Sequence, residues 1–332
     1  MNATIQTLPR APVAAPHATH KFKLLLRREF WENKGGFLWA PLVAGGISLL
    51  FTLLGAIGGS VLKHRHAAEI MQADARPDEM ARVFGGAGDV ALLGGVGITL
   101  IVLGFVVFFY SLGSLYDDRR DRSVLFWKSL PVSDSSTVGA KAAWALILAP
   151  VVAILIGVLV GLASWLIAAI TSTVNGLPGA SGIFTYSHPI RLVGSVIALV
   201  PLYTLWALPA VGWLMFCSAA ARSKPFLWAV MIPILSCAMV SFGNVVMGMG
   251  YDVSRMWYVV VYRGLLSVFP ATWIPHLQSS VGGIHTPDEI ANVVNVANNW
   301  TVAATADLWI GVVVGLALIG AAIRLRRWRD EG

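Results

Sequence analysis

Six stretches of roughly 20 or more mostly apolar residues run through this chain of 332 residues. A stretch of that length carries a helix across the hydrocarbon core of a bilayer, which is about 30 Å thick. Only helices and closed barrels satisfy their backbone groups in lipid, and runs this long favour helices. We therefore expect an all-α, polytopic membrane helix bundle, with spans near residues 37–62, 90–115, 142–170, 192–220, 226–249 and 308–325.

The charge content excludes most soluble classes. Charged residues make up 12% of the chain and hydrophobic residues 57%, whereas about a quarter of a typical soluble domain is charged. The net charge of +7 could suggest a nucleic-acid partner. The charges cluster instead at the ends of the apolar runs, as membrane topology requires. We therefore expect the chain to contact the lipid bilayer and not to bind nucleic acid.

The distribution of Lys and Arg predicts the orientation. Seven of the 24 basic residues fall on one side of the predicted spans, and the remainder fall on the other side. The seven are Lys63, Arg65, Arg76, Arg82, Arg191, Arg255 and Arg263. Because the richer side faces the cytoplasm, we expect a multi-pass protein of a bacterial inner (cytoplasmic) membrane with both termini inside.

Two segments beside the spans have their own patterns. Residues 1–20 are expected to be a flexible cytoplasmic lead before a single transmembrane domain over 21–332. In residues 21–34, Phe22, Leu26 and Phe30 recur every fourth position among basic residues, which predicts an interfacial helix or, alternatively, a plain basic anchor. Residues 253–270 are apolar but too short for a span, which predicts a re-entrant or interfacial outer helix.

Residues 116–133 combine charge with apolar bulk. Six consecutive charged residues, 117–122, precede three large apolar ones. The residues that matter most here are Asp117, Asp118, Arg119, Arg120 and Arg122, then Leu125, Phe126 and Trp127. Such a segment cannot cross a bilayer, and a solvated connector would expose its apolar side chains without need. We interpret it as a loop that docks a partner outside the membrane, with a solvated connector as the alternative.

Motifs for chemistry within the chain are missing. There is no Gly-Lys dipeptide, so a phosphate-binding Walker A loop cannot be formed, and no zinc-protease, serine-hydrolase or Cys-x-x-Cys motif occurs. Cys217 and Cys237 lie in apolar runs, as small buried residues would. Ionisable residues are scarce in the predicted spans, although ion-coupled carriers usually place them there. A separate motor protein would then supply the energy for transport. We expect neither enzymatic activity nor a metal site in this chain.

Two segments carry a family resemblance. They are Leu24–Lys34, which contains Arg-Arg-Glu-Phe-Trp-Glu-Asn-Lys, and the run from Asp117 through Ser-Leu-Pro-Val-Ser at 129–133 to Gly-Ala-Lys at 139–141. In these segments, and in topology over essentially the whole chain, the sequence resembles permease subunits of the ABC-2 family of ATP-binding-cassette exporters (type V exporter fold). Ala140 interrupts the Gly-Lys dipeptide that the family has before its third span.

The resemblance implies a half-transporter that works by alternating access. A second copy or a related permease would complete the pathway, and a separate ATPase subunit would carry ATP and Mg, with no cofactor in this chain. The ATPase would dock on the loop 116–133 and on the helix 21–34. The residues implied are Asp117, Asp118, Arg119, Arg120, Arg122, Leu125, Phe126, Trp127, Arg28, Glu29 and Glu32.

The substrate path has only weak sequence signals. Asn244 is a polar residue in the fifth span, and Met239 and Met247 accompany it. A helix–helix hydrogen bond and apolar packing are the alternatives for these residues. The scarcity of charge favours an amphipathic or apolar cargo. An ATP-independent channel or secondary carrier, and a membrane scaffold that recruits a soluble partner, stay open as other functions.

Overall fold

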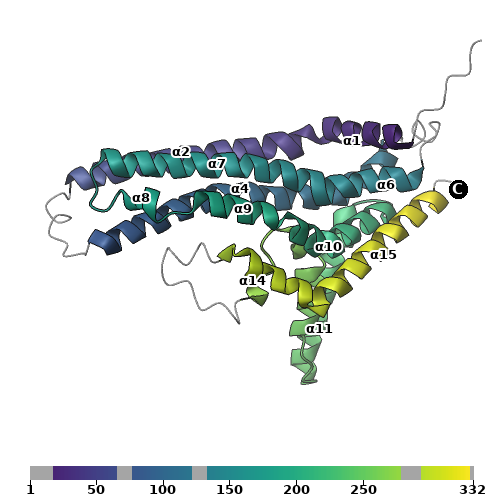
Figure 1. Ribbon diagram of the computed structural model, residues 1–332. Coiled ribbons are helices and arrows are strands. Elements are labelled where there is room, and N and C mark those ends of the chain that lie inside the picture. The colour runs from purple at the N-terminus through teal and green to yellow at the C-terminus, as the bar shows by residue number, and fades with distance from the viewer. Residues whose placement is uncertain (1–17, 66–76, 122–132, 278–292, 330–332) are drawn as a thin grey trace, which may run out of the picture.

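The computed structural model describes residues 18–65, 77–121, 133–277 and 293–329, and every regular element within these ranges is helical (Figure 1). Six helices in them are long and apolar enough to cross a membrane. They are Lys21–Val61, Asp78–Arg120, Asp134–Val174, Val200–Ala220, Leu227–Met247 and Ala306–Trp328. The predicted all-α fold is confirmed, and the chain has the helices of a multi-pass membrane protein.

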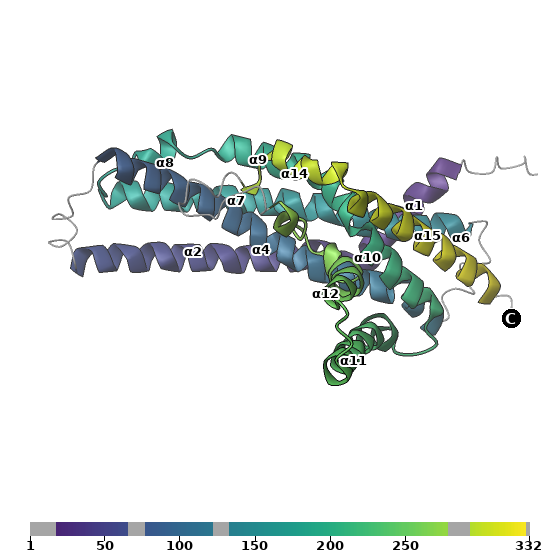
Figure 2. The ribbon, with the colours of Figure 1, turned by 90° about the horizontal axis from the view of Figure 1, so that it is seen from below.

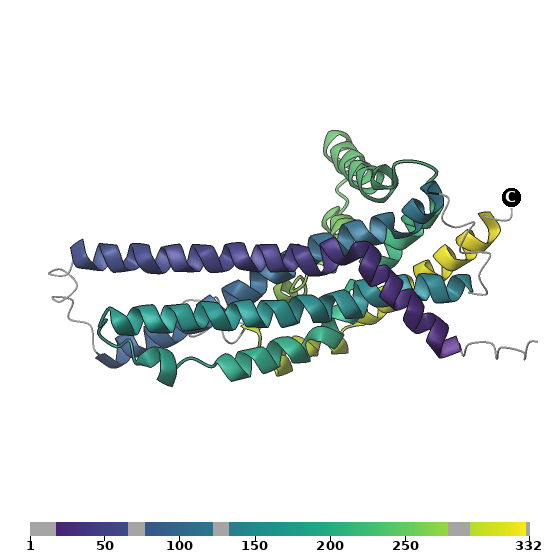
Figure 3. The same ribbon diagram turned by 90° about the horizontal axis from the view of Figure 1, so that it is seen from above.

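Three very long helical stretches lie side by side and form the main bundle (Figures 1 and 3). The first joins α1 (Ala18–Lys34), the wide turn η1 (Gly35–Trp39) and α2 (Ala40–Arg65). The second is α4 (Pro77–Arg120), and the third joins α6 (Asp134–Ala143), η2 (Trp144–Leu148) and α7 (Ala149–Val174). With 44 residues, α4 is about 66 Å long. It therefore exceeds the roughly 30 Å hydrocarbon core and continues beyond it.

Glycines allow α4 and α7 to pack backbone to backbone. A Cβ atom placed on Gly95 would lie 2.8 Å from the Cα of Gly161, and one placed on Gly161 would lie 2.5 Å from the carbonyl oxygen of Leu92. No larger side chain fits at either position without separating the helices. Small residues at such contacts are the usual basis of helix association in membranes.

The predicted span 192–220 is broken in two. The chain forms the short helix α8 (Gly182–Thr185), then α9 (Pro189–Ala198) and α10 (Val200–Ala220), with the interruption at Leu199. Pro201 in the first turn of α10 has no backbone N–H to donate to the carbonyl four residues earlier, which accounts for the break. Beyond it, α10 packs along α15 (Ala306–Arg329), where Gly212 and Gly315 again bring two backbones together.

The fifth long helix leaves the bundle. After η3 (Leu227–Met231), α11 (Ile232–Met247) projects to one side and is largely exposed (Figures 1 and 2). The chain then returns through α12 (Ser254–Trp257), η4 (Tyr258–Arg263) and η5 (Leu266–Val268), which occupy the segment predicted at 253–270. Three short elements precede α15: η6 (Ile274–His276), α14 (Val296–Trp300) and η8 (Thr301–Ala304).

The two ends of the bundle differ. At one end, on the right in Figure 1, lie α1, α6 and the C-terminal turns of α15, and the last turn of α4 joins them. We call this the α1/α6 end. The opposite end carries α8, the start of α4 and the end of α2. The candidate site lies at the α1/α6 end.

Candidate functional site

The predicted loop 116–133 is wrong in its first part, because α4 continues through Arg120. Asp117 and Arg120 lie one turn apart, with 3.7 Å between Arg120 Nη1 and Asp117 Oδ1. A cation in the last turn of a helix also stabilises it by interacting with the helix dipole. The buried side chains of Leu112 and Leu115 extend the packed face of α4 to the same point. The predicted docking residues Arg122, Leu125, Phe126 and Trp127 lie outside the described residues.

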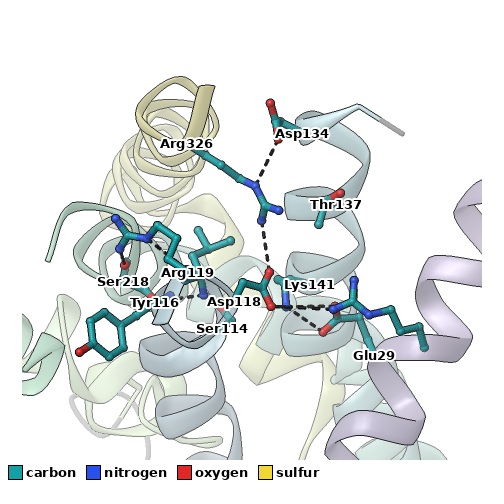
Figure 4. A network of polar contacts seen from close by, with 12 residues as sticks. Glu29, Ser114, Tyr116, Asp118, Arg119, Asp134, Thr137, Lys141, Ser218 and Arg326 are labelled. Carbon is teal, nitrogen blue, oxygen red and sulfur yellow. Dashed lines mark hydrogen bonds and ion pairs between the residues drawn. The ribbon is translucent and has the colours of Figure 1, made fainter. Parts of the chain in front are cut away.

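Five charged side chains from four helices meet at the α1/α6 end (Figure 4). We call Glu29, Asp118, Asp134, Lys141 and Arg326 the charge cluster. Lys141 Nζ lies 3.0 Å from Glu29 Oε1 and 3.4 Å from Asp118 Oδ1. Arg326 Nη1 lies 3.3 Å from Asp118 Oδ2, and its Nε lies 3.2 Å from Asp134 Oδ1. The charge cluster therefore links α1, α4, α6 and α15.

The centre of the charge cluster is buried. The side chains of Glu29 and Lys141 are 1% and 3% exposed, and Tyr110 donates a 2.9 Å hydrogen bond to Glu29 Oε2. Charges removed from water are tolerated only when they are paired and hydrogen-bonded. Moving any one of the four helices away would leave a charge unpaired, so these helix ends are expected to move together.

A second contact attaches α10 to the end of α4. The Arg119 guanidinium donates to the carbonyl oxygens of Ser218 and Ala221, the latter at 3.1 Å. The hydroxyl of Ser218 accepts from the backbone N–H groups of Leu115 and Tyr116 at 3.1 and 3.0 Å. The last turn of α4 thus contacts α1, α6, α10 and α15.

The predicted docking residues fall into two groups. Glu29, Asp118 and Arg119 hold the chain's own helices together, and Arg28 contacts both Glu32 (Nε to Oε1, 2.7 Å) and Asp118 (Nη2 to Oδ1, 3.9 Å). In contrast, the side chains of Asp117 and Arg120 are 52% and 62% exposed, and Glu32 is also exposed. The exposed group is the one that a partner could contact.

Sequence reasoning missed three members of the charge cluster. None of them was predicted as a site residue: Lys141 entered only as a topology signal and as part of the Gly-Ala-Lys segment of the resemblance, Arg326 only as a topology signal, and Asp134 not at all. Lys141 offered one usable signal, since a lysine at the start of a long apolar run needs a carboxylate nearby. Nothing in the sequence indicated which carboxylate, because Glu29 and Asp118 are 112 and 23 positions away.

The residues predicted for a substrate path are not brought together around a common space. Met239 and Met247 are exposed on α11. The Asn244 side chain donates to the carbonyl oxygen of Tyr251 and accepts from its N–H, both at 2.9 Å. Asn244 therefore orders the turn after its own helix rather than bonding to a neighbouring helix.

A further ion pair joins Arg263 to Asp307, whose side chain is 41% exposed. Arg263 is buried, with its guanidinium carbon 3.7 Å from the centre of the Trp206 ring. Its Nε lies 3.4 Å from Asp307 Oδ2, which also accepts a 2.6 Å hydrogen bond from Tyr258. The contacts attach η4 to α10 and α15. The apolar bundle therefore holds more ionic structure than the predicted spans indicated.

Among the described residues, no three His, Cys, Asp or Glu side chains gather as a metal site would require. Comparison of the chain with protein-family models found no match, and comparisons with curated proteins and with solved structures found none either.

Proposed function

We propose that this chain is the membrane-spanning permease subunit of an ATP-binding-cassette exporter. It would lie in a bacterial inner membrane with both termini in the cytoplasm and work with a second permease copy or a related one. A separate ATPase subunit would bind ATP and Mg. The α1/α6 end, where basic residues gather around α1, α4 and α15, would face the cytoplasm.

The charge cluster is the observation that carries this proposal. Asp117 and Arg120 are exposed on the same helical turn as Asp118, which is ion-paired to Lys141 and Arg326. A partner that pushes on the exposed side of this turn would act on a residue joined to α6 and α15, and to α1 through Arg28. Force applied at the membrane surface would then reach the bundle as a movement of whole helices, as alternating access requires.

The contacts at the end of α4 suggest an order for the steps of the transport cycle. ATP binding would close the partner ATPases, and their movement would displace the last turn of α4 together with α1, α6 and α15. The direct contact of Arg119 with α10 would carry the displacement to the break at Leu199. The helices of the two permease halves would shift against each other and expose the pathway to the opposite side.

Purification of the tagged full-length chain from its native membrane in mild detergent tests the proposal. We expect a stoichiometric partner with a Walker A loop, identified by mass spectrometry, and ATP hydrolysis in the preparation. Recovery of the chain alone, without ATPase activity, would contradict the exporter function.

A secondary carrier is the second candidate, favoured by the ion pair between the buried Arg263 and Asp307. Carriers place such groups beside a midplane cavity, whereas Arg263 packs on Trp206 and donates to its carbonyl oxygen. Substrate flux that persists in vesicles without ATP, responds to a proton gradient and is lost in Asp307→Asn would favour the carrier. The membrane scaffold would bind a partner without any substrate-dependent turnover.

A further inference from the structure

A cavity of about 870 Å³ lies between α4 and the segment that joins α1 to α2. It falls within the range of about 300–1,000 Å³ typical of small-molecule sites. One face of α4 forms a wall from Val102 through Phe105, Phe109 and Gly113 to Asp117, and Asp121 directly after the helix extends it. This wall is about 28 Å long. The opposite wall consists of Arg28, Glu32 and the turn Gly35–Phe37.

The backbone explains why this space is open. The backbone leaves helical geometry at Asn33 and continues through the wide turn η1 into α2. As a result, α1 lies at an angle to α2 (Figure 3). Gly35 and Gly36 face the cavity without side chains, and a Cβ atom placed on Gly35 would have no other atom within 4 Å. The opening is thus formed by the kink and by two adjacent glycines.

The two ends of the cavity differ in chemistry. Val102, Phe105, Val106 and Phe109 form an apolar end, and Phe105 and Phe109 are exposed. The other end, at the membrane surface, carries carboxylates. An occupant that satisfies both ends must be amphipathic, with its polar group toward the charge cluster.

The negative charge of the polar end favours a cationic ligand. Four carboxylates and two cations line the cavity, and the cations Arg28 and Lys141 are already within ion-pair distance of carboxylates. Asp117 and Asp121 share the single guanidinium of Arg120, at 3.7 and 3.2 Å. An anionic head group would be repelled here, whereas an ammonium or phosphonium group would complete the pairing. The rings of Phe105 and Phe109 add an apolar surface for the rest of such a molecule.

We propose that this cavity binds amphipathic organic cations from the inner leaflet, with the charged group at Asp117 and Asp121 and the apolar part along Val102–Phe109. Their role as transported substrates rests on the function proposed above, but binding does not. Binding can be measured on the full chain without an ATPase. A cavity that binds no cation would therefore contradict this proposal alone, and a missing ATPase would contradict only the proposed function.

The test is equilibrium binding of radiolabelled tetraphenylphosphonium to the full chain in phosphatidylcholine nanodiscs, with empty nanodiscs subtracted. Triphenylphosphine oxide serves as an uncharged analogue of similar shape. We expect saturable binding of the phosphonium only. The double variant Asp117→Asn with Asp121→Asn should weaken it about tenfold or more. Glu79→Gln, at the opposite end of the same helix, should leave it unchanged.

A steric pair completes the test. Gly35→Leu should abolish binding by filling the cavity, while Gly46→Leu should not, although a Cβ atom at either position meets no other atom within 4 Å. Equal binding by these two variants, equal binding of the uncharged analogue, or no saturable binding would overturn the proposal. Phosphonium binding in detergent that phosphatidylcholine displaces would assign the cavity to bilayer lipid and would also overturn it.

Discussion

At the scale of single residues, the chain separates charges that hold it together from charges that remain exposed. Arg119 and Arg120 are neighbours with opposite roles. Arg119 donates to two carbonyl oxygens at the α10 terminus. Within the part of the chain that the structure describes, Arg120 pairs only with the exposed carboxylates of Asp117 and Asp121. The distinction is invisible in the sequence, where both belong to one charged run.

Lys141→Met should destabilise the fold strongly. It leaves Glu29 buried without its cation, and breaking a buried pair costs about 3–5 kcal/mol. Thermal unfolding in detergent measures the loss. Lys23→Met, an exposed lysine on α1, is the matched control. The double variant Glu29→Gln with Lys141→Met should lose less than the sum of the two single variants, and strict additivity would show that the pair is not coupled.

Arg120→Glu should leave folding intact and reduce recovery of the proposed ATPase subunit, because it reverses an exposed charge at the surface that we assign to docking. Arg119→Glu should instead lower the monodisperse fraction in gel filtration, since it places a carboxylate against carbonyl oxygens. Arg82→Glu, exposed near the opposite end of α4, controls for charge reversal. Full recovery of the ATPase with Arg120→Glu would exclude this turn as its contact.

At the scale of helices, packing depends on which glycine of a pair faces the neighbouring helix. A Cβ atom on Gly95 would collide with the backbone of Gly161, while one on its neighbour Gly94 would meet nothing within 4 Å. The same residue type therefore has a packing role at one position and none at the next. Helix α4 can approach α7 closely only along the face that carries Gly95.

Gly95→Ala should destabilise the bundle by about 1–3 kcal/mol, the usual range for overpacking a close contact. Gly94→Ala should be neutral or slightly stabilising, because alanine is the better helix former. Thermal unfolding of the two variants side by side measures the difference. Equal stability would mean that α4 and α7 do not pack at this distance in the membrane.

At the scale of the whole molecule, three helical stretches exceed the bilayer, and their extensions carry the ionic contacts. The charge cluster lies at the α1/α6 end. Asp89 accepts hydrogen bonds from the backbone and ring of His188 near the other end (2.8 and 3.4 Å). Between these ends the outward-facing surface of α2 is almost wholly apolar. This distribution fits one membrane crossing per long stretch.

Cysteine labelling in intact cells tests the orientation. Glu79→Cys should react with a membrane-impermeant maleimide from outside, and Glu32→Cys should react only after lysis. Cys217 and Cys237 are buried and should add little background, which the unmodified chain measures. The reverse pattern would place the α1/α6 end outside and contradict docking of a cytoplasmic ATPase there.

The sequence by itself determined the helices. Apolar runs of spanning length force the backbone to satisfy its own hydrogen bonds. The predicted spans 226–249 and 308–325 coincide closely with long helices, the spans 37–62, 90–115 and 142–170 belong to longer helical stretches, and the span 192–220 is broken at Leu199. Even that break had a local cause in Pro201. The conformation of the charged run at 116–120 had no such local cause. Whether it formed a helix or a loop depended on packing against α10 and on partners elsewhere in the chain.

Only the tertiary structure decided which charges pair and where space remains. Glu29, Asp118, Lys141 and Arg326 meet because α1, α4, α6 and α15 come together at one end of the bundle, and no local pattern encodes that meeting. The cavity beside them likewise exists between two helices and belongs to neither. Secondary structure follows from short-range backbone chemistry, whereas electrostatic pairing and cavities depend on distances between residues that are remote in the sequence.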